Sequence, residues 1–170
     1  MDPITIRGAR VDDFPSIIKI NESGRPGVAP LDAAELATLL KESPCFYVAE
    51  AGAQVAGYLI AYTPRSTYDG EEFAWFQRRY TDFLYIDQVA VAEMMRRRHV
   101  ASRLYQWAKD IALQKGLSSL VCELNIEPPN PVSRAFHANQ GFVRVGVLDV
   151  QDGRRVALRR GLVGVRATWT

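Results

Sequence analysis

The sequence is poor in the residues that build metal sites and disulfide frameworks. Only two cysteines and two histidines occur among its 170 residues. Cys45 and Cys122 lie far apart, each within an apolar segment, so we expect buried free thiols in a reducing compartment and no disulfide. Neither residue type shows the spacing of a metal site, and we therefore expect the protein to use no metal.

Membrane-spanning and secretory signals are also missing from the sequence. No apolar run approaches the roughly 20 residues that a helix needs to cross a bilayer. Residues 1–7 lack the basic start and apolar stretch of a secretory signal, so we expect a cytoplasmic protein without a membrane partner. The net charge of +2 is too small for an extended nucleic-acid-binding surface, and we expect no nucleic acid partner.

What is present fits a single globular domain over residues 1–170. The sequence is 48% hydrophobic and 24% charged, which are ordinary values for a soluble domain. Stretches rich in β-branched and aromatic residues alternate with stretches that show helical spacing. We predict strands at residues 4–7, 45–50, 55–62, 83–91, 118–126, 142–150 and 155–162, and helices at residues 12–21, 33–41, 100–115 and 131–139. Residues 64–73 show no period and are predicted to be irregular.

The order of these elements predicts a mixed sheet. Turn signals at residues 51–54 and at Asp152-Gly153 indicate hairpins, whose strands are antiparallel. The strand, helix and strand between residues 83 and 126 instead indicate a parallel pair.

The stretch from Asp82 to Lys115 carries the strongest functional signal. Its strand runs through Arg96-Arg97-Arg98-His99 into a helix that begins near Val100. The first amides of a helix lack intrahelical partners and lie at the positive end of the helix dipole, so they favour anions such as phosphate. The alternative interpretation is a charged helix start that only faces solvent.

Residues 91–101 resemble the acetyl-coenzyme A (acetyl-CoA) binding motif of the GNAT superfamily of N-acetyltransferases, Gln/Arg-x-x-Gly-x-Gly/Ala. Arg96 matches the first position and Ala101 the last. His99 stands where the family has its central glycine. A glycine there lets the backbone approach the pyrophosphate without an intervening Cβ.

A second segment, residues 130–142, resembles the family's Asn-x-x-Ala/Ser-x-x-Phe-Tyr-x-x-x-Gly-Phe pattern. His137 occupies the position at which many members have tyrosine. Residues 83–87 and 122–131 are similar to a bacterial branch of predicted acetyltransferases. The matching residues of the second segment are Asn130, Ser133, Phe136, Gly141 and Phe142.

The resemblance implies a fold and a co-substrate. The implied fold class is α/β (α+β), with a GNAT-like central mixed, mostly antiparallel sheet, parallel central strands that splay at the cofactor site, and about four flanking helices. The implied co-substrate is acetyl-CoA. The implied cofactor-binding residues are Val89, Ala90 and Val91 at the thioester, Arg96, Arg97, Arg98, His99, Val100, Ala101 and Ser102 at the pyrophosphate, and Asn130, Ser133 and Phe136.

The resemblance also implies acetyl transfer to an amine of a small molecule or peptide, by direct attack in a ternary complex. The amine must lose a proton, and the candidate bases are Glu123 and Asp87. The leaving thiolate needs a proton, for which the candidate donors are His137 and Tyr85. Structural roles compete with each: an ion pair for Glu123, a hydrogen-bond acceptor for Asp87, and a passive surface position for His137.

Other hypotheses stay open from the sequence. The departures at His99 and His137 fit a GNAT fold that has lost catalysis and serves as a ligand-binding or regulatory module. A nucleic-acid binder would use residues 96–98 with Trp75 and Tyr80, but the low net charge disfavours it. A homodimer formed through sheet edges is a further possibility.

Overall fold

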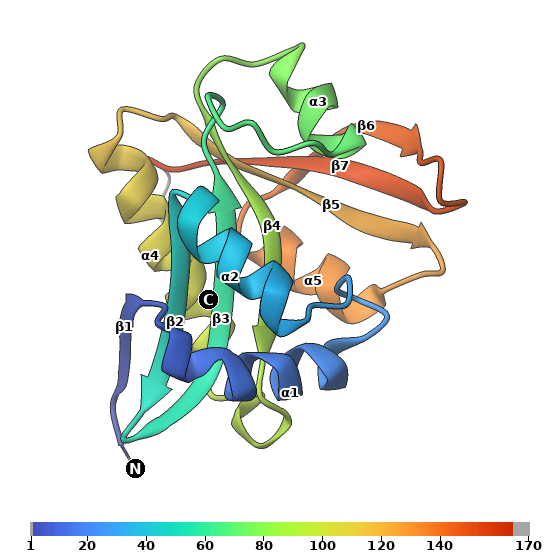
Figure 1. Ribbon diagram of the computed structural model, residues 1–170. Helices are drawn as coiled ribbons and strands as arrows, with labels where there is room; N and C mark the ends of the chain where they lie inside the picture. Colours follow the sequence, from blue (N-terminus) through green and yellow to red (C-terminus); the bar gives the residue numbers. More distant parts are fainter. Residues whose placement is uncertain (1, 165–170) are drawn as a thin grey trace. The chain divides into compact units, whose positions relative to one another are not determined.

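The computed structural model describes residues 2–164, so Met1 and the last six residues of the predicted domain lie outside the described residues. Seven strands form one sheet in the order β1-β2-β3-β4-β5-β7-β6 (Figure 1). The strands are β1 (Ile4–Gly8), β2 (Cys45–Ala51), β3 (Gln54–Tyr62), β4 (Phe83–Val91), β5 (Ser119–Glu127), β6 (Val143–Asp149) and β7 (Arg155–Leu162). The helices are α1 (Phe14–Gly24), α2 (Ala33–Glu42), α3 (Glu71–Gln77), α4 (Val100–Gln114) and α5 (Pro131–Asn139), with short 3-10 helices η1 (Val11–Asp13) and η2 (Glu93–Met95).

The predicted mixed, mostly antiparallel sheet is confirmed. The pairs β1–β2, β2–β3, β5–β7 and β6–β7 are antiparallel, whereas β4 and β5 are parallel. The parallel ladder joins Phe83 to Ser119, Leu84 to Leu120 and Tyr85 to Val121. The strand, helix and strand pattern around residue 100 therefore identified the parallel pair correctly.

The described residues contain five α-helices, which fits the expected fold with about four, but one of the five was not predicted from the sequence. The additional helix is α3, which begins inside the stretch 64–73 that was predicted to be irregular. At seven residues it is too short to show a helical period, and it buries Phe73 and Phe76 completely. Its ring contacts with Phe83 and Tyr85, and not its local sequence pattern, hold it in place.

The chain divides into two compact units, each assembled from separate segments. Residues 2–62 and 86–107 make up the described part of the first unit, and residues 63–85 and 108–164 that of the second. β4 and α4 therefore each contribute residues to both units. The single domain expected for residues 1–170 stays a prediction.

The first unit is built on the antiparallel strands β1, β2 and β3. α1 and α2 lie together over β2 and β3 (Figure 1), where Ile17 and Leu36 are fully buried. Burying a side chain of this size contributes about 1.5–3 kcal/mol. At the start of α1, Arg7 donates two hydrogen bonds of 2.8 Å to the Asp13 carboxylate, which holds the pKa of Asp13 below its usual value.

The second unit is built on the antiparallel strands β5, β7 and β6. The predicted hairpin at Asp152-Gly153 is confirmed, with Gly153 at φ +90°. Gly146 of β6 permits close packing, because a Cβ at this position would lie 2.5 Å from the Trp75 ring. Arg154, beside the hairpin turn, donates to Glu72 of α3 at 3.0 Å.

Candidate functional site

The connection from β4 to α4 lies in the first unit and has the predicted form. β4 ends at Val91, η2 follows, and α4 begins at Val100. The amides of Val100, Ala101 and Ser102 are the first of the helix and have no intrahelical partner. Amides at this position of a helix favour an anion, because they lie at the positive end of the helix dipole.

Two residues just before α4 adopt the left-handed backbone conformation. Arg97 has φ 63° and His99 has φ 60°. This conformation costs a residue with a side chain about 1–2 kcal/mol, whereas glycine adopts it readily. His99, at the glycine position of the motif, thus keeps the backbone conformation that favours glycine. The residue at this position carries an imidazole, and its backbone adopts a conformation typical of glycine.

The arginine side chains of this connection differ in their surroundings. Arg96 and Arg97 are exposed, and the guanidinium of Arg96 donates to the carbonyl of Ser23 at 3.1 Å. Arg98 is half-buried, and its Nη1 lies 2.8 Å from the sulfur of Met95. The buried Nε of Arg98 has no hydrogen-bond partner within residues 2–164.

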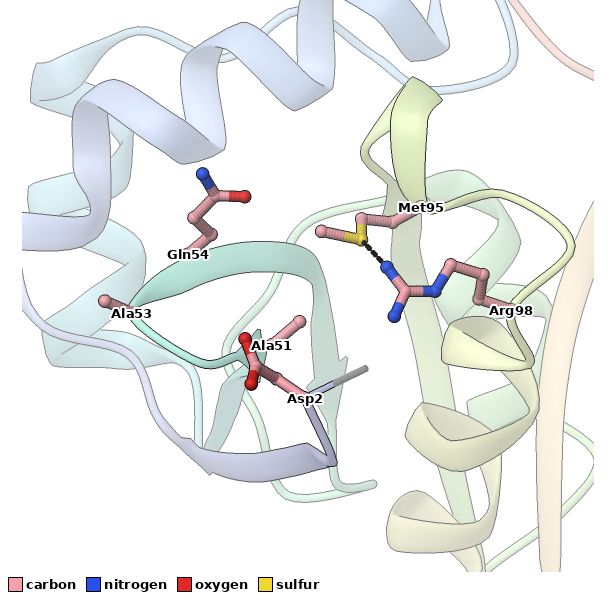
Figure 2. Close-up of a pocket in the computed structure, with 6 residues that line it drawn as sticks. All are labelled: Asp2, Ala51, Ala53, Gln54, Met95 and Arg98. Carbon is pink, nitrogen blue, oxygen red and sulfur yellow. Dashed lines mark hydrogen bonds between the residues drawn. The ribbon is translucent and has the colours of Figure 1, made fainter.

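Arg98 also lines an open pocket of about 590 Å³ in the first unit. Figure 2 shows its guanidinium extending toward the turn between β2 and β3. Arg98 is the one predicted site residue in this lining. The lining residues are Asp2, Ala51, Ala53, Gln54, Met95 and Arg98.

The end of β4 alternates between buried and half-buried side chains. Ala90 is buried, while Val89 and Val91 are half-buried, as is Asp87. Burial raises the pKa of Tyr58 to about 12 and also raises that of Tyr62, and the nearby negative charge of Asp87 adds to both shifts. Asp87 therefore lies close to two tyrosines of β3.

Sequence reasoning missed a buried polar cluster next to these residues. Asn21 of α1 donates to the hydroxyl of Tyr58 at 3.0 Å, and that hydroxyl donates to Gln88 of β4 at 2.9 Å. All three side chains are at most 6% exposed. The available signal was a polar residue at a core-facing position of a strand and of a helix, which burial requires to be hydrogen-bonded.

In the second unit, the structure brings Tyr85 and Glu123 together. The Tyr85 hydroxyl donates to a carboxylate oxygen of Glu123 at 2.8 Å. Tyr85 is 1% exposed, and its ring contacts Tyr68, Phe73 and Phe76 with centroid separations of 6.1, 5.4 and 6.1 Å. Because the packed ring fixes the hydroxyl, the hydrogen bond orients the half-buried carboxylate.

α5 begins as the sequence predicts. The side chain of Asn130 accepts a hydrogen bond from the amide of Ser133 at 3.2 Å, and Pro131 is the first helical residue. Asn130 is thus a helix cap, whether or not it also contacts a ligand.

His137 lies buried within α5. Its Nδ1 is 2.7 Å from the carbonyl oxygen of Ser133, so Nδ1 donates this hydrogen bond. Burial lowers the pKa of His137, which favours the neutral ring. The ring packs edge-on against Phe136 and Phe142, each at a centroid separation of 5.3 Å. A neutral ring protonated at Nδ1 carries no proton on Nε2.

Within residues 2–164 no group of three or more histidine, cysteine, aspartate or glutamate side chains is arranged to hold a metal ion. In the same range, every helix is too short or too polar to cross a membrane. Cys45 and Cys122 are both buried free thiols, as predicted.

The sequence profile of the Acetyltransferase (GNAT) family matches residues 12–142. A search of curated protein sequences finds no significant match. Among solved structures, Ard1 from Thermoplasma volcanium has a TM-score of 0.74 at 19% identity, over 94% of this chain and 97% of that chain.

Two further structures show the same architecture. The ribosomal-protein-S18-alanine N-acetyltransferase from Escherichia coli has a TM-score of 0.70 at 14% identity, covering 96% of each chain. A chain of the NatC complex bound to Gag peptide and CoA has a TM-score of 0.70 at 17% identity, over 95% of this chain and 99% of that chain. At these identities the similarity establishes the fold.

Proposed function

Because this chain belongs to the Acetyltransferase (GNAT) family, we propose that it transfers an acetyl group from acetyl-CoA to an amine of an acceptor. The proposal treats residues 1–170 as one acetyltransferase domain in the cytoplasm. The observation that carries it is the conformation at His99, since the turn before α4 keeps the glycine-like backbone of a phosphate-binding motif.

We assign the pyrophosphate of the co-substrate to residues 96–102. The free amides at the start of α4 supply hydrogen bonds, and the exposed Arg96 and Arg97 supply positive charge. The backbone amides of Val89, Ala90 and Val91 are assigned to the pantetheine arm and the thioester carbonyl. Asn130, Ser133 and Phe136 are assigned to further contacts with CoA.

We assign the proton transfers to Glu123 and Tyr85. The amine nitrogen attacks the thioester carbon, a C–N bond forms, and the C–S bond breaks with its electron pair on sulfur. Glu123 takes the proton that the nitrogen loses, directly or through a water. Tyr85 gives its proton to the thiolate and regains one from Glu123 along their hydrogen bond, so the amine proton ends on the CoA thiol.

The two other candidates fit these roles less well. A neutral His137 with its proton on Nδ1 has no proton to give from Nε2, so the tyrosine is the better donor. Asp87 lies beside Tyr58 and Tyr62 in the first unit, where its negative charge disfavours ionisation of both phenols. We rank Asp87 as the second candidate base, because the Tyr85 hydroxyl already donates to Glu123.

The proposed acceptor is a small-molecule or peptide amine. The Escherichia coli neighbour is described as an enzyme for an alanine of ribosomal protein S18, and the NatC complex binds a Gag peptide. These neighbours make peptide amines the first acceptors to test. A homodimer through the outermost strands of the sheet, β1 or β6, is part of the same proposal.

Calorimetry with CoA, followed by thiol release from acetyl-CoA, tests the proposal. The amine panel contains short peptides with a free α-amine, the same peptides blocked at that amine, spermidine and lysine. We expect saturable CoA binding and thiol release with at least one free amine. No CoA binding at millimolar concentration would refute the proposal, and binding without thiol release from any amine would favour the regulatory-module alternative.

A further inference from the structure

The pocket beside the β2–β3 turn is lined by two side chains of opposite charge, Asp2 and Arg98. Neither charge takes part in an ion pair within residues 2–164. Figure 2 shows the guanidinium entering from the connection between β4 and α4, and the carboxylate lying at the turn. The proposed pyrophosphate site draws its charge from Arg96 and Arg97, so the charge of Arg98 has no assigned role.

The guanidinium of Arg98 lacks a strong hydrogen-bond acceptor. Its Nη1 lies 2.8 Å from the sulfur of Met95, and a thioether is a weak acceptor. Its buried Nε has no hydrogen-bond partner among the described residues. Buried polar groups are normally hydrogen-bonded, and the strongest partners of a guanidinium are carboxylate and phosphate groups. The missing acceptor therefore indicates an anionic group on a ligand.

The carboxylate of Asp2 lies against the backbone of the turn. A Cβ at Gly52, which has φ +60°, would lie 2.6 Å from the Oδ2 of Asp2. Glycine at this position thus leaves room for the carboxylate. A carboxylate in the pocket attracts an ammonium group and repels a polyanion such as the diphosphate of CoA.

The rest of the lining suits a small, partly apolar ligand. Its apolar surface comes from Ala51, Ala53 and Met95, and Gln54 adds an amide. The volume of about 590 Å³ lies within the range of small-molecule sites. Among the lining residues, only Arg98 belongs to the stretch assigned to the pyrophosphate. The pocket is therefore a different site from the start of α4.

From these observations we propose that the pocket binds an apolar α-amino acid in its zwitterionic form. The ligand carboxylate pairs with Arg98, the ammonium group pairs with Asp2, and the side chain packs against Met95 and Ala51. A ligand that lacks either charge leaves one protein charge without a partner, so the site selects ligands that carry both. The inference goes beyond the acetyltransferase and does not depend on it. The amino acid and CoA bind at the same time.

Calorimetry of the wild-type protein tests the inference with L-leucine, L-methionine and L-phenylalanine. We expect saturable binding of at least one of them, with a Kd on the order of 1 mM or lower. For a ligand of leucine type, 4-methylpentanoate lacks the ammonium group and 3-methylbutylamine lacks the carboxylate. Each of these analogues should bind about tenfold or more weakly than leucine. Excess CoA should leave the Kd of the amino acid unchanged.

Two variants assign each charge to its partner. In Arg98→Gln, leucine and 3-methylbutylamine should bind equally weakly, because the ligand carboxylate has lost its partner. In Asp2→Asn, leucine and 4-methylpentanoate should bind equally weakly for the same reason. Arg25→Gln and Asp12→Asn remove the same charges from exposed positions outside the lining and should leave each Kd unchanged. Asp2 is exposed, so its variant tests the inference even if Arg98→Gln fails to fold.

Several results would overturn the inference. One is that none of the three amino acids binds at up to about 20 mM. Another is equal binding of leucine and both analogues to the wild-type protein, which would leave only an apolar pocket. A Kd for leucine that rises in proportion to the CoA concentration would place both ligands in one site. A protein that releases no thiol with any amine refutes the proposed function and leaves the amino-acid result standing.

Discussion

The turn before α4 and the Tyr85–Glu123 pair use different parts of the chain for the proposed chemistry. In the turn, the backbone forms the proposed anion site, through the first amides of α4 and two residues in the left-handed conformation. In the Tyr85–Glu123 pair, side chains carry the proposed chemistry, because the Tyr85 hydroxyl orients the Glu123 carboxylate. We therefore expect the proposed backbone site to tolerate His99, whereas the proposed side-chain site depends on the Tyr85 hydroxyl and the Glu123 carboxylate.

The largest effect on kcat is expected for loss of the proposed base, Glu123. Glu123→Gln keeps the shape of the residue and removes the base, so kcat falls by about 10²–10⁴-fold while the Kd for CoA is unchanged. Steady-state thiol release and calorimetry measure the two quantities. The matched variant Asp87→Asn is expected to reduce kcat much less. A larger loss in Asp87→Asn than in Glu123→Gln would exchange the two assignments.

Removing the hydroxyl that orients this carboxylate is expected to have the next largest effect. Tyr85→Phe keeps the buried ring but removes both the hydrogen bond of 2.8 Å to Glu123 and the proposed proton donor, so kcat falls by about 10–10²-fold. Tyr80→Phe in the same unit leaves both residues untouched and serves as the control. Equal kcat values in the two variants would show that the hydroxyl neither orients the base nor donates the proton.

His137 provides a prediction about pH. Burial lowers its pKa in the fold below the value of 6.5 for an exposed histidine, so below about pH 6.5 the unfolded chain binds more protons than the folded one. The free energy of unfolding therefore falls as the pH is lowered from 7 to 5, by at most about 1.4 kcal/mol per pH unit for one proton. Urea titrations of wild type and His137→Gln measure this slope. If the slope is equally steep in His137→Gln, another group is responsible.

The smallest effect is expected in the turn, where only backbone strain is relieved. His99→Gly should raise the free energy of unfolding by up to about 1 kcal/mol, because glycine adopts φ near 60° without the steric cost. Ser102→Gly, at a helical position, should lower it by roughly 0.5–1 kcal/mol. Denaturant unfolding compares the two variants.

The variant His99→Gly also tests whether the imidazole of His99 affects the Kd for CoA. Tighter binding in His99→Gly would mean that the ring obstructs the phosphates, and weaker binding would mean that the ring contacts them. His99→Ala removes the ring but retains the Cβ, so it separates the two causes. An unchanged Kd in both variants would place the cofactor away from this turn and contradict the assignment of residues 96–102.

Most of the fold was predictable because its signals are local. The turn signals at residues 51–54 and at Asp152-Gly153 and the helical spacing of α4 are each contained in short stretches of sequence, and each element formed as expected. α3 was missed because its seven residues owe their conformation to aromatic rings from β4. Likewise, no local pattern around Asn21 indicates that its side chain meets the Tyr58 hydroxyl of β3 and the Gln88 amide of β4.

The sequence by itself determined the seven strands, four of the five α-helices within residues 2–164, the parallel pair and the family, because these depend on short-range periodicity and on two contiguous motifs. The tertiary structure decided which polar groups meet. It joined Tyr85 to Glu123 and clustered Asn21 with Tyr58 and Gln88. Those pairings span 30 to 67 residues of chain, and they form because a buried polar group must find a partner wherever the packed elements bring one.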